Sequence, residues 1–181
     1  MPEYSMEWFP LSEINTQMKS RILGMIVLAA TAILFAGCPY TSEVPITTTG
    51  MKLPLGLTGV WEDPDNPSEK IEIKATSDSN IEIIKTTSSE GSDPVIEDYL
   101  GFFSDVNGSI FLNLKENDEY STSYYLYKIE RQGDNKIKLL SVTPNIREKF
   151  STSEELKKFF AANMQNSYFY ESTETTYFKV K

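Results

Sequence analysis

The sequence predicts a mainly β protein, a small antiparallel barrel of about eight strands with one helix towards its C-terminus. Three observations lead to this fold class. From Leu57 onward, apolar and polar residues alternate in several short runs, turn-forming Gly, Asn, Asp and Ser separate these runs, and one segment after Ser151 has helical spacing instead. A barrel is favoured because closure leaves no exposed strand edge. An α+β sheet with the helix packed on one face is the alternative.

The first pair of strands surrounds a polar turn. Ile71 and Ile73 alternate with charged residues, residues 77–80 have turn composition, and Ile81 and Ile83 resume the alternation. Two apolar runs of the same period on either side of a short turn are typical of a β-hairpin. We therefore expect the two runs to pair as antiparallel neighbours.

Two further hairpins follow from the same pattern. Their flanking runs and turns are 99–103 and 110–114 around Asp105-Val106-Asn107-Gly108, and 125–129 and 137–139 around Gln132-Gly133-Asp134-Asn135. Asn-Gly and Gly-Asp pairs suit the positive backbone angles of tight hairpin turns.

One segment has helical rather than strand periodicity. Ser151 and Glu154 have the spacing of a capping box, and the apolar residues that follow recur every three or four positions: Leu156, Phe159, Phe160 and Met164. The apolar stripe of this helix must be covered by the rest of the domain. Residues 167–181 return to aromatic and β-branched alternation, which predicts a C-terminal hairpin.

The segment before the domain has the layout of a secretory signal. Lys19 and Arg21 form a basic head, and the uncharged apolar run from Ile22 to Phe35 follows. As a helix this run would be roughly 20 Å long, which is shorter than the roughly 30 Å hydrocarbon core of a bilayer. A cleavable signal is therefore favoured over a permanent membrane span.

The end of this run, Leu34-Phe35-Ala36-Gly37-Cys38, resembles the lipobox of bacterial lipoproteins. The resemblance implies cleavage between Gly37 and Cys38, and acylation of Cys38 as the first mature residue. Phe35 stands where the family more often has Leu. Several acyl chains hold a protein on a membrane far more firmly than one. Since Pro39 follows rather than Asp, resemblance to sorted lipoproteins implies a cell-envelope location, at the outer membrane.

These features divide the chain into four parts. Residues 1–17 are expected to be a mis-assigned extension, with translation beginning at Met18, because a signal normally has its basic head at the start. A genuine cytoplasmic extension is the alternative. Residues 18–37 are the signal peptide. Residues 38–56 are rich in Pro, Thr and Gly and are expected to be a flexible tether, and residues 57–181 are the globular β domain.

The domain also resembles the lipocalins, eight-stranded barrels that bind small apolar ligands. The resemblance rests on Gly59-Val60-Trp61, which matches the Gly-x-Trp of their first strand. In that family an Arg from the last strand covers the Trp, whereas this chain offers Lys179 or Lys181. The arrangement of lipobox, linker, Trp-bearing strand, late helix and aromatic tail is also similar to small lipoproteins of Gram-negative bacteria, which implies an envelope location.

The composition excludes several classes of function. The chain has no His and one Cys, so Ser-His-Asp and Cys-His catalysis and a zinc site of His or Cys ligands are excluded, and no cofactor is expected. With 17 Lys and Arg against 26 Asp and Glu, the net charge is −9, which disfavours binding to nucleic acid. The same charge means that membrane residence has to come from the anchor.

Aromatic side chains are the most suggestive candidates for binding. Those in or near the predicted strands are Tyr99, Phe102, Phe103, Tyr124, Tyr125, Tyr127, Tyr168, Phe169 and Tyr170. Most of them are explained by strand packing, but some can line a cavity for an apolar ligand. With the first-strand Trp, the expected ligand-binding residues are Trp61, Phe103, Tyr125 and Tyr127.

Three functional hypotheses result. The first is a non-enzymatic envelope lipoprotein that binds a small apolar molecule or an envelope protein partner. The second is a glycoside hydrolase that uses two carboxylates, which needs no His, and the third is a structural accessory subunit. The loop Glu62-Asp63-Pro64-Asp65-Asn66 could offer oxygen ligands to calcium, but an acidic turn explains it better, so no metal site is expected.

Overall fold

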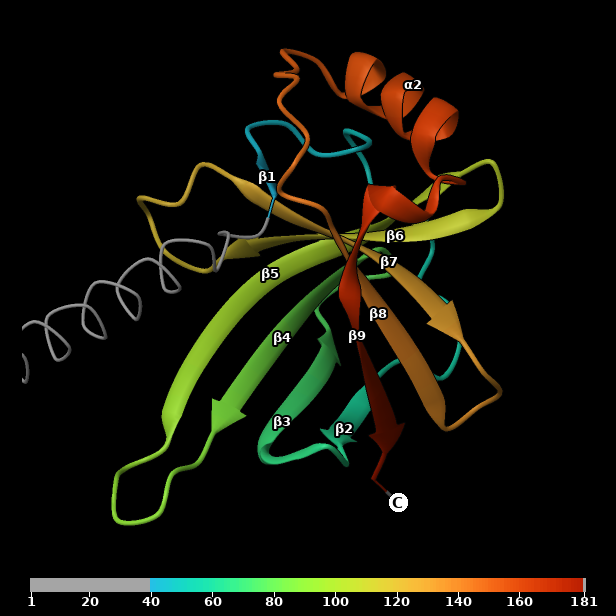
Figure 1. Cartoon of the computed structure of the whole chain (residues 1–181). Helices are drawn as coiled ribbons and strands as arrows, with labels where there is room; N and C mark the ends of the chain where they lie inside the picture. The colour runs from blue at the N-terminus through green and yellow to red at the C-terminus, as the bar shows by residue number, and fades with distance from the viewer. Residues whose placement is uncertain (1–39, 181) are drawn as a thin grey trace, which may run out of the picture. The chain divides into compact units, whose positions relative to one another are not determined.

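The computed structural model describes residues 40–180, which form a closed antiparallel barrel (Figure 1). The elements in this part of the chain are β1 (Thr41–Ser42), β2 (Gly59–Asp63), β3 (Asn66–Ala75), β4 (Asn80–Thr87), β5 (Val95–Val106), β6 (Ser109–Glu116), β7 (Tyr124–Arg131), β8 (Lys136–Val142), α2 (Ser153–Asn163), the 3₁₀ turn η1 (Ser167–Phe169) and β9 (Tyr170–Lys179). From β2 to β8 each strand pairs with the next, and β9 pairs with both β8 and β2. The predicted barrel is confirmed, and the alternative of an open sheet is wrong.

The three predicted hairpins are confirmed. Within β3–β4, Ile73 lies opposite Ile83, and β5–β6 and β7–β8 pair in the same antiparallel manner. The β5–β6 turn consists of Asn107 and Gly108, whose φ angles are 52° and 82°. Two consecutive positive φ angles are what a two-residue hairpin turn requires, and Asn-Gly adopts them at little cost.

Alternation along the strands fills the interior of the barrel with apolar side chains. These buried residues are Leu57, Trp61, Ile71, Ile73, Ile81, Ile83, Phe103, Leu112, Leu114, Ile129, Ile137 and Tyr177. We call the end of the barrel that carries the β3–β4, β5–β6 and β7–β8 turns the closed end. Segment 51–57 crosses it, with the Met51 N–H donating to the Phe103 carbonyl and the Leu53 N–H to the Asp78 carbonyl. The opposite end, with the β2–β3, β4–β5 and β6–β7 connections, is the open end.

Helix α2 lies outside the ring of strands and covers a second apolar core (Figure 1). This outer core consists of Tyr40, Ile46, Val106, Phe111, Leu126, Val142, Leu156, Phe160, Met164 and Phe169. The predicted apolar stripe is confirmed, but the cap lies one residue later than predicted. Thr152, not Ser151, accepts from the Glu155 N–H at 3.2 Å, and Glu155 in turn accepts from the Ser151 N–H.

The C-terminal segment corrects one prediction. Residues 167–181 were expected to form a hairpin, whereas η1 leads into the single strand β9. The polar residues Glu171 to Glu174 suggest a turn in the sequence, yet they continue the strand, and Glu174 lies opposite Leu140. A barrel needs a last strand long enough to pair with both of its neighbours, and this requirement overrides the local turn propensity.

The N-terminal boundary of the domain is a second correction. Residues 38–56 were expected to be a flexible tether, but the described part, 40–56, packs on the barrel. Thr41 pairs with Tyr125, and Ile46 is completely buried. The Thr-rich and Pro-rich composition resembles a linker, but the barrel supplies hydrogen-bond partners for the backbone of the segment. The domain therefore includes residues 40–56.

The unit from Pro39 to Lys181 is compact by itself. Both apolar cores and all strands of the barrel come from residues within 40–180, which is what a domain needs to fold on its own. The predicted extension 1–17, the signal 18–37 and Cys38 lie outside the described residues. Within residues 40–180, α2 is too short and too polar to serve as a membrane-spanning helix.

Candidate functional site

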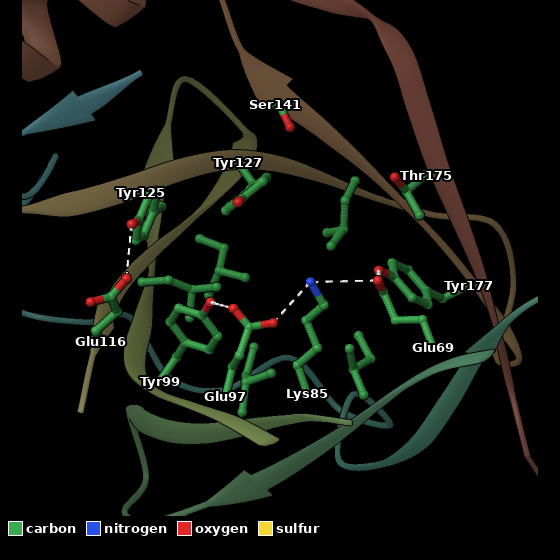
Figure 2. Close-up of a pocket in the computed structure, with 15 residues that line it drawn as sticks. Glu69, Lys85, Glu97, Tyr99, Glu116, Tyr125, Tyr127, Ser141, Thr175 and Tyr177 are labelled. Atoms are coloured by element: carbon green, nitrogen blue, oxygen red, sulfur yellow. Dashed lines mark hydrogen bonds and ion pairs between the residues drawn. The ribbon is translucent and has the colours of Figure 1, made fainter. Parts of the chain in front are cut away.

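A half-enclosed cavity of about 450 Å³ lies inside the barrel towards the open end (Figure 2). Its volume falls within the range of about 300–1,000 Å³ that is usual for small-molecule sites. The lining residues are Glu69, Ile71, Ile83, Lys85, Glu97, Tyr99, Leu112, Leu114, Glu116, Tyr125, Tyr127, Leu139, Ser141, Thr175 and Tyr177. They come from β3 to β9, so the wall is built by strands rather than by loops.

The wall changes from apolar to charged along strands β3, β4 and β6. Towards the open end, the inward residues are Ile73, Ile71 and Glu69 on β3, Ile81, Ile83 and Lys85 on β4, and Leu112, Leu114 and Glu116 on β6. Strand β5 adds Tyr99 and then Glu97. Because side chains alternate between the two faces of a strand, a spacing of two keeps all of these residues on the inside. The cavity therefore has an apolar floor and a charged mouth.

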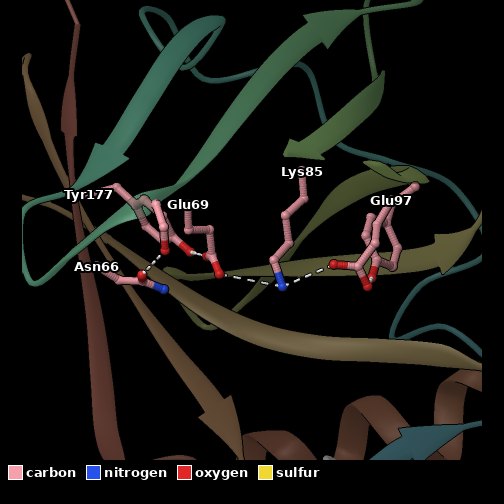
Figure 3. A network of polar contacts seen from close by, with 7 residues as sticks. Asn66, Glu69, Lys85, Glu97 and Tyr177 are labelled. Carbon is pink, nitrogen blue, oxygen red and sulfur yellow. Dashed lines mark hydrogen bonds and ion pairs between the residues drawn. The ribbon is translucent and has the colours of Figure 1, made fainter. Parts of the chain in front are cut away.

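Tyrosine hydroxyls connect the floor to the mouth. Three of them donate a hydrogen bond to a glutamate: Tyr99 to Glu97 at 3.0 Å, Tyr125 to Glu116 at 3.0 Å and Tyr177 to Glu69 at 2.7 Å (Figures 2 and 3). Each bond helps to fix the direction of a carboxylate. The three glutamates are thus held in place on the wall.

Tyr127 differs from these three tyrosines. Within residues 40–180 its hydroxyl has no hydrogen-bond partner, and it points into the cavity (Figure 2). Burial, assisted by neighbouring negative charge, raises the pKa of Tyr127 to about 12. The hydroxyl therefore stays protonated at neutral pH and can donate or accept a hydrogen bond from a bound molecule.

Lys85 bridges two of the glutamates (Figure 3). Its Nζ lies 3.1 Å from a Glu97 oxygen and 3.5 Å from a Glu69 oxygen, and its side chain is 32 % exposed. Burial disfavours both charges, but pairing outweighs it, so the pKa of Lys85 is raised and that of Glu97 is lowered. At neutral pH Lys85 is therefore an ammonium and Glu97 a carboxylate.

Two of the four predicted ligand-binding residues line the cavity, namely Tyr125 and Tyr127. Trp61 and Phe103 do not, because they are fully buried in the core at the closed end. Trp61 donates from Nε1 to the Leu57 carbonyl at 2.9 Å. Its side chain is therefore part of the apolar core at the closed end.

The charged lining residues Glu69, Lys85, Glu97 and Glu116 were missed by the sequence reasoning. The alternation of residues along the strands could have identified two of them. Glu69 lies two residues before the inward Ile71, and Lys85 lies two residues after the inward Ile83. A charged residue in phase with a buried stripe at the end of a strand indicates a polar barrel mouth.

The residues that carry the resemblance to lipocalins meet at the closed end. The Nζ of Lys179 lies 5.5 Å from the centre of the Trp61 ring and donates to the Gly56 carbonyl at 2.9 Å. Lys179, one of the two lysines considered for covering Trp61, does so, and Lys181 lies outside the described residues. No protein-family model matches the chain, and no curated protein matches it either.

The acidic loop after Trp61 is an ordinary turn. Asp63 accepts from the Asp65 N–H at 2.9 Å, and Glu62 pairs with Lys70 at 2.6 Å. Within residues 40–180, no group of three or more His, Cys, Asp or Glu side chains has the geometry to hold a metal ion.

The lining tyrosines predict a loss of stability at high pH. Burial, followed by the neighbouring carboxylates, raises the pKa of Tyr99 and Tyr177 well above the ordinary value of about 10. Burial, followed by the nearby Tyr125, raises the pKa of Tyr127 to about 12. A pKa that is higher in the folded state gives stability that is complete below the unfolded pKa and is lost as pH rises towards the folded value. We expect the urea midpoint to fall above pH 10.

Absorbance at 295 nm, which reports tyrosinate, checks this expectation. The lining tyrosines should ionise together with unfolding, and Tyr127→Phe should reduce the pH dependence of the midpoint. Ionisation of every tyrosine near pH 10 in a protein that stays folded would contradict the prediction.

Proposed function

We propose that this protein is a non-enzymatic lipoprotein of the bacterial cell envelope that holds a small molecule inside its barrel. The cavity of about 450 Å³ is the observation that carries the proposal. Ile71, Ile83 and Leu112 form a floor for an apolar group, and tyrosine hydroxyls above them can orient it. The lipobox at Cys38 supports the membrane anchor.

The position of β1 supports a cavity that opens towards the membrane. Thr41 of β1 pairs with Tyr125, which lines the cavity, so the described chain begins beside the open end. In the mature lipoprotein only Pro39 would separate the acylated Cys38 from Tyr40. Val95 and Ile96, at the same end of the barrel, are 60 % and 67 % exposed and offer an apolar contact to lipid. A molecule could then pass directly between bilayer and barrel.

The electrostatics of the mouth favour binding over glycoside hydrolysis. A general acid of a glycosidase needs a raised pKa so that it holds its proton at neutral pH. Lys85 and Tyr99 overcome the effect of burial on Glu97 and lower the pKa of this carboxyl instead. Glu97 is therefore ionised and serves better as a fixed charge than as a proton donor.

Native mass spectrometry of the full chain, purified from its own envelope, tests both parts of the proposal. We expect a polypeptide that begins at Cys38 and carries acyl chains, together with a bound small molecule that is released on unfolding. Thr175→Trp, which fills the cavity from β9, should lose the small molecule and keep the acyl chains. Cys38→Ser should lose the acyl chains.

Each part of the proposal can fail separately. A wild-type chain without acyl groups would contradict the anchor. A wild-type chain that never carries a small molecule, or a Thr175→Trp variant that retains one, would contradict binding in the cavity.

A further inference from the structure

We infer that the cavity is built for an amphiphilic organic cation, a primary ammonium with an apolar alkyl or arylalkyl group. The ammonium would lie at the mouth among Glu69, Glu97 and Glu116, and the apolar group would extend to the floor. This inference rests on the proposed function, because it specifies the class of small molecule that the cavity takes.

The mouth of the cavity has more negative than positive side chains, which favours a cationic ligand. Three carboxylates face one ammonium, Lys85, among the residues that line the cavity. Lys85 pairs with Glu69 and Glu97, and no cation of residues 40–180 pairs with Glu116, which accepts from the neutral Tyr125 hydroxyl. The lining keeps an excess of negative charge, and a half-enclosed wall of low dielectric strengthens the attraction of that charge for a cation.

The cavity also offers hydrogen-bond acceptors, which suit an ammonium group. An ammonium group has three N–H donors and no acceptor, so it needs a site rich in oxygen lone pairs. Glu116 and the Tyr127 hydroxyl offer such oxygens within one cavity. A carboxylate ligand would instead find Lys85, whose ammonium already contacts two glutamates. The polar groups of the cavity therefore favour a ligand that donates hydrogen bonds over one that accepts them.

Two tyrosine rings in the cavity wall suit both parts of such a ligand. Tyr99 and Tyr125 meet edge to face, with ring centres 6.3 Å apart, between the charged mouth and the apolar floor. The face of a tyrosine ring attracts a cation, and its edge packs against methylene groups. From mouth to floor the cavity presents carboxylates, tyrosine rings and then aliphatic side chains. A ligand with an ammonium at one end and an apolar chain next to it would match this order.

Three probes of equal chain length test the inference: octylammonium, 1-octanol and octanoate. Isothermal titration at pH 7 uses the domain of residues 39–181, with circular dichroism as the check of folding. We expect octylammonium to bind about 10-fold more tightly than 1-octanol, which corresponds to about 1.4 kcal/mol. Octanoate should bind most weakly, and added salt should weaken octylammonium alone.

A matched pair of variants locates the effect. Glu116→Gln removes one negative charge inside the mouth, and Glu82→Gln removes one from the outward face of β4. We expect the former to reduce octylammonium affinity about five-fold with no change for 1-octanol, and the latter to change neither. Lys85→Gln should strengthen octylammonium binding, since it removes the cation that competes for the carboxylates.

The outcomes separate this inference from the proposed function. If 1-octanol or octanoate binds as tightly as octylammonium, the cation class is wrong while the cavity still binds a small molecule. If Glu116→Gln and Glu82→Gln changed octylammonium affinity equally, the ligand ammonium would not lie at the mouth beside Glu116. Binding of none of the three probes would count against the proposed function as well.

Discussion

Phe160→Ala is expected to lower the free energy of unfolding by about 3–5 kcal/mol, the usual cost of truncating a buried aromatic side chain. Phe160 is completely buried on the face of α2 that packs on the barrel. Its ring lies 5.1 Å from that of Phe111 on the outer barrel wall and 5.0 Å from that of Phe169 in η1, both edge to face. Truncation would remove both ring contacts and leave a cavity between helix and barrel.

Urea unfolding of the domain, followed by tryptophan fluorescence, measures this cost. Phe159→Ala is the matched control, because Phe159 is the neighbouring residue of the helix and is only half-buried. We expect the control to cost clearly less. A loss below about 1 kcal/mol for Phe160→Ala would mean that α2 is not held on the barrel by this side chain.

The same variant separates stability from binding. Phe160 belongs to the outer core, whereas the cavity is lined by residues on the inward face of the strands. The folded fraction of Phe160→Ala is therefore expected to keep the wild-type affinity for any molecule that the cavity takes. This makes the outer core a source of stability that is independent of the candidate site.

The local parts of the fold could be predicted from the sequence, because hairpins and helices are specified by nearby residues. The alternation of Ile71 and Ile73, the Asn107-Gly108 turn and the helical spacing of Leu156 and Phe160 each act within a few positions. The pairing of β9 with β2 joins residues more than a hundred positions apart, as in Trp61 opposite Lys179. No local pattern encodes such a contact.

The candidate site could be predicted only in part for a related reason. Tyr125 and Tyr127 were identified because aromatic residues are conspicuous in strands. Glu69, Lys85 and Glu97 were not, because a charged residue in a strand is normally assigned to the solvent-facing side. Their inward position becomes evident once closure of the barrel is known, since they then lie in the lining of the cavity.

The packing of residues 40–56 was missed because their partners are also distant in the sequence. Asn113 is completely buried on the outward face of β6, and its Oδ1 accepts from the Ile46 N–H at 2.8 Å. Its Nδ2 donates to the Phe102 carbonyl at 3.2 Å and to the Ser104 hydroxyl at 2.9 Å. One amide side chain thus connects the N-terminal segment to β5 and β6.

Asn113→Ala is expected to lower the free energy of unfolding by about 2–4 kcal/mol. The Ile46 N–H would remain buried without an acceptor, and an unsatisfied buried group costs about 1–3 kcal/mol in addition to the lost packing. Hydrogen exchange should show the Ile46 amide losing most of its protection, since the bond that holds it is removed. Ser104→Ala, which leaves this bond intact, should cost less and keep the amide protected.

If Cys38 carries the proposed lipid anchor, Asn113→Ala has a second consequence, which concerns the distance between that anchor and the barrel. With the segment docked, only Pro39 would lie between an acylated Cys38 and the packed residue Tyr40, so the open end would stay close to the bilayer. Release of residues 40–56 would give a tether of about 17 residues with a mean span of roughly 20–25 Å. Unchanged exchange at Ile46 in Asn113→Ala would mean that contacts other than the Asn113 bond hold the segment on the barrel, and no such tether would be released.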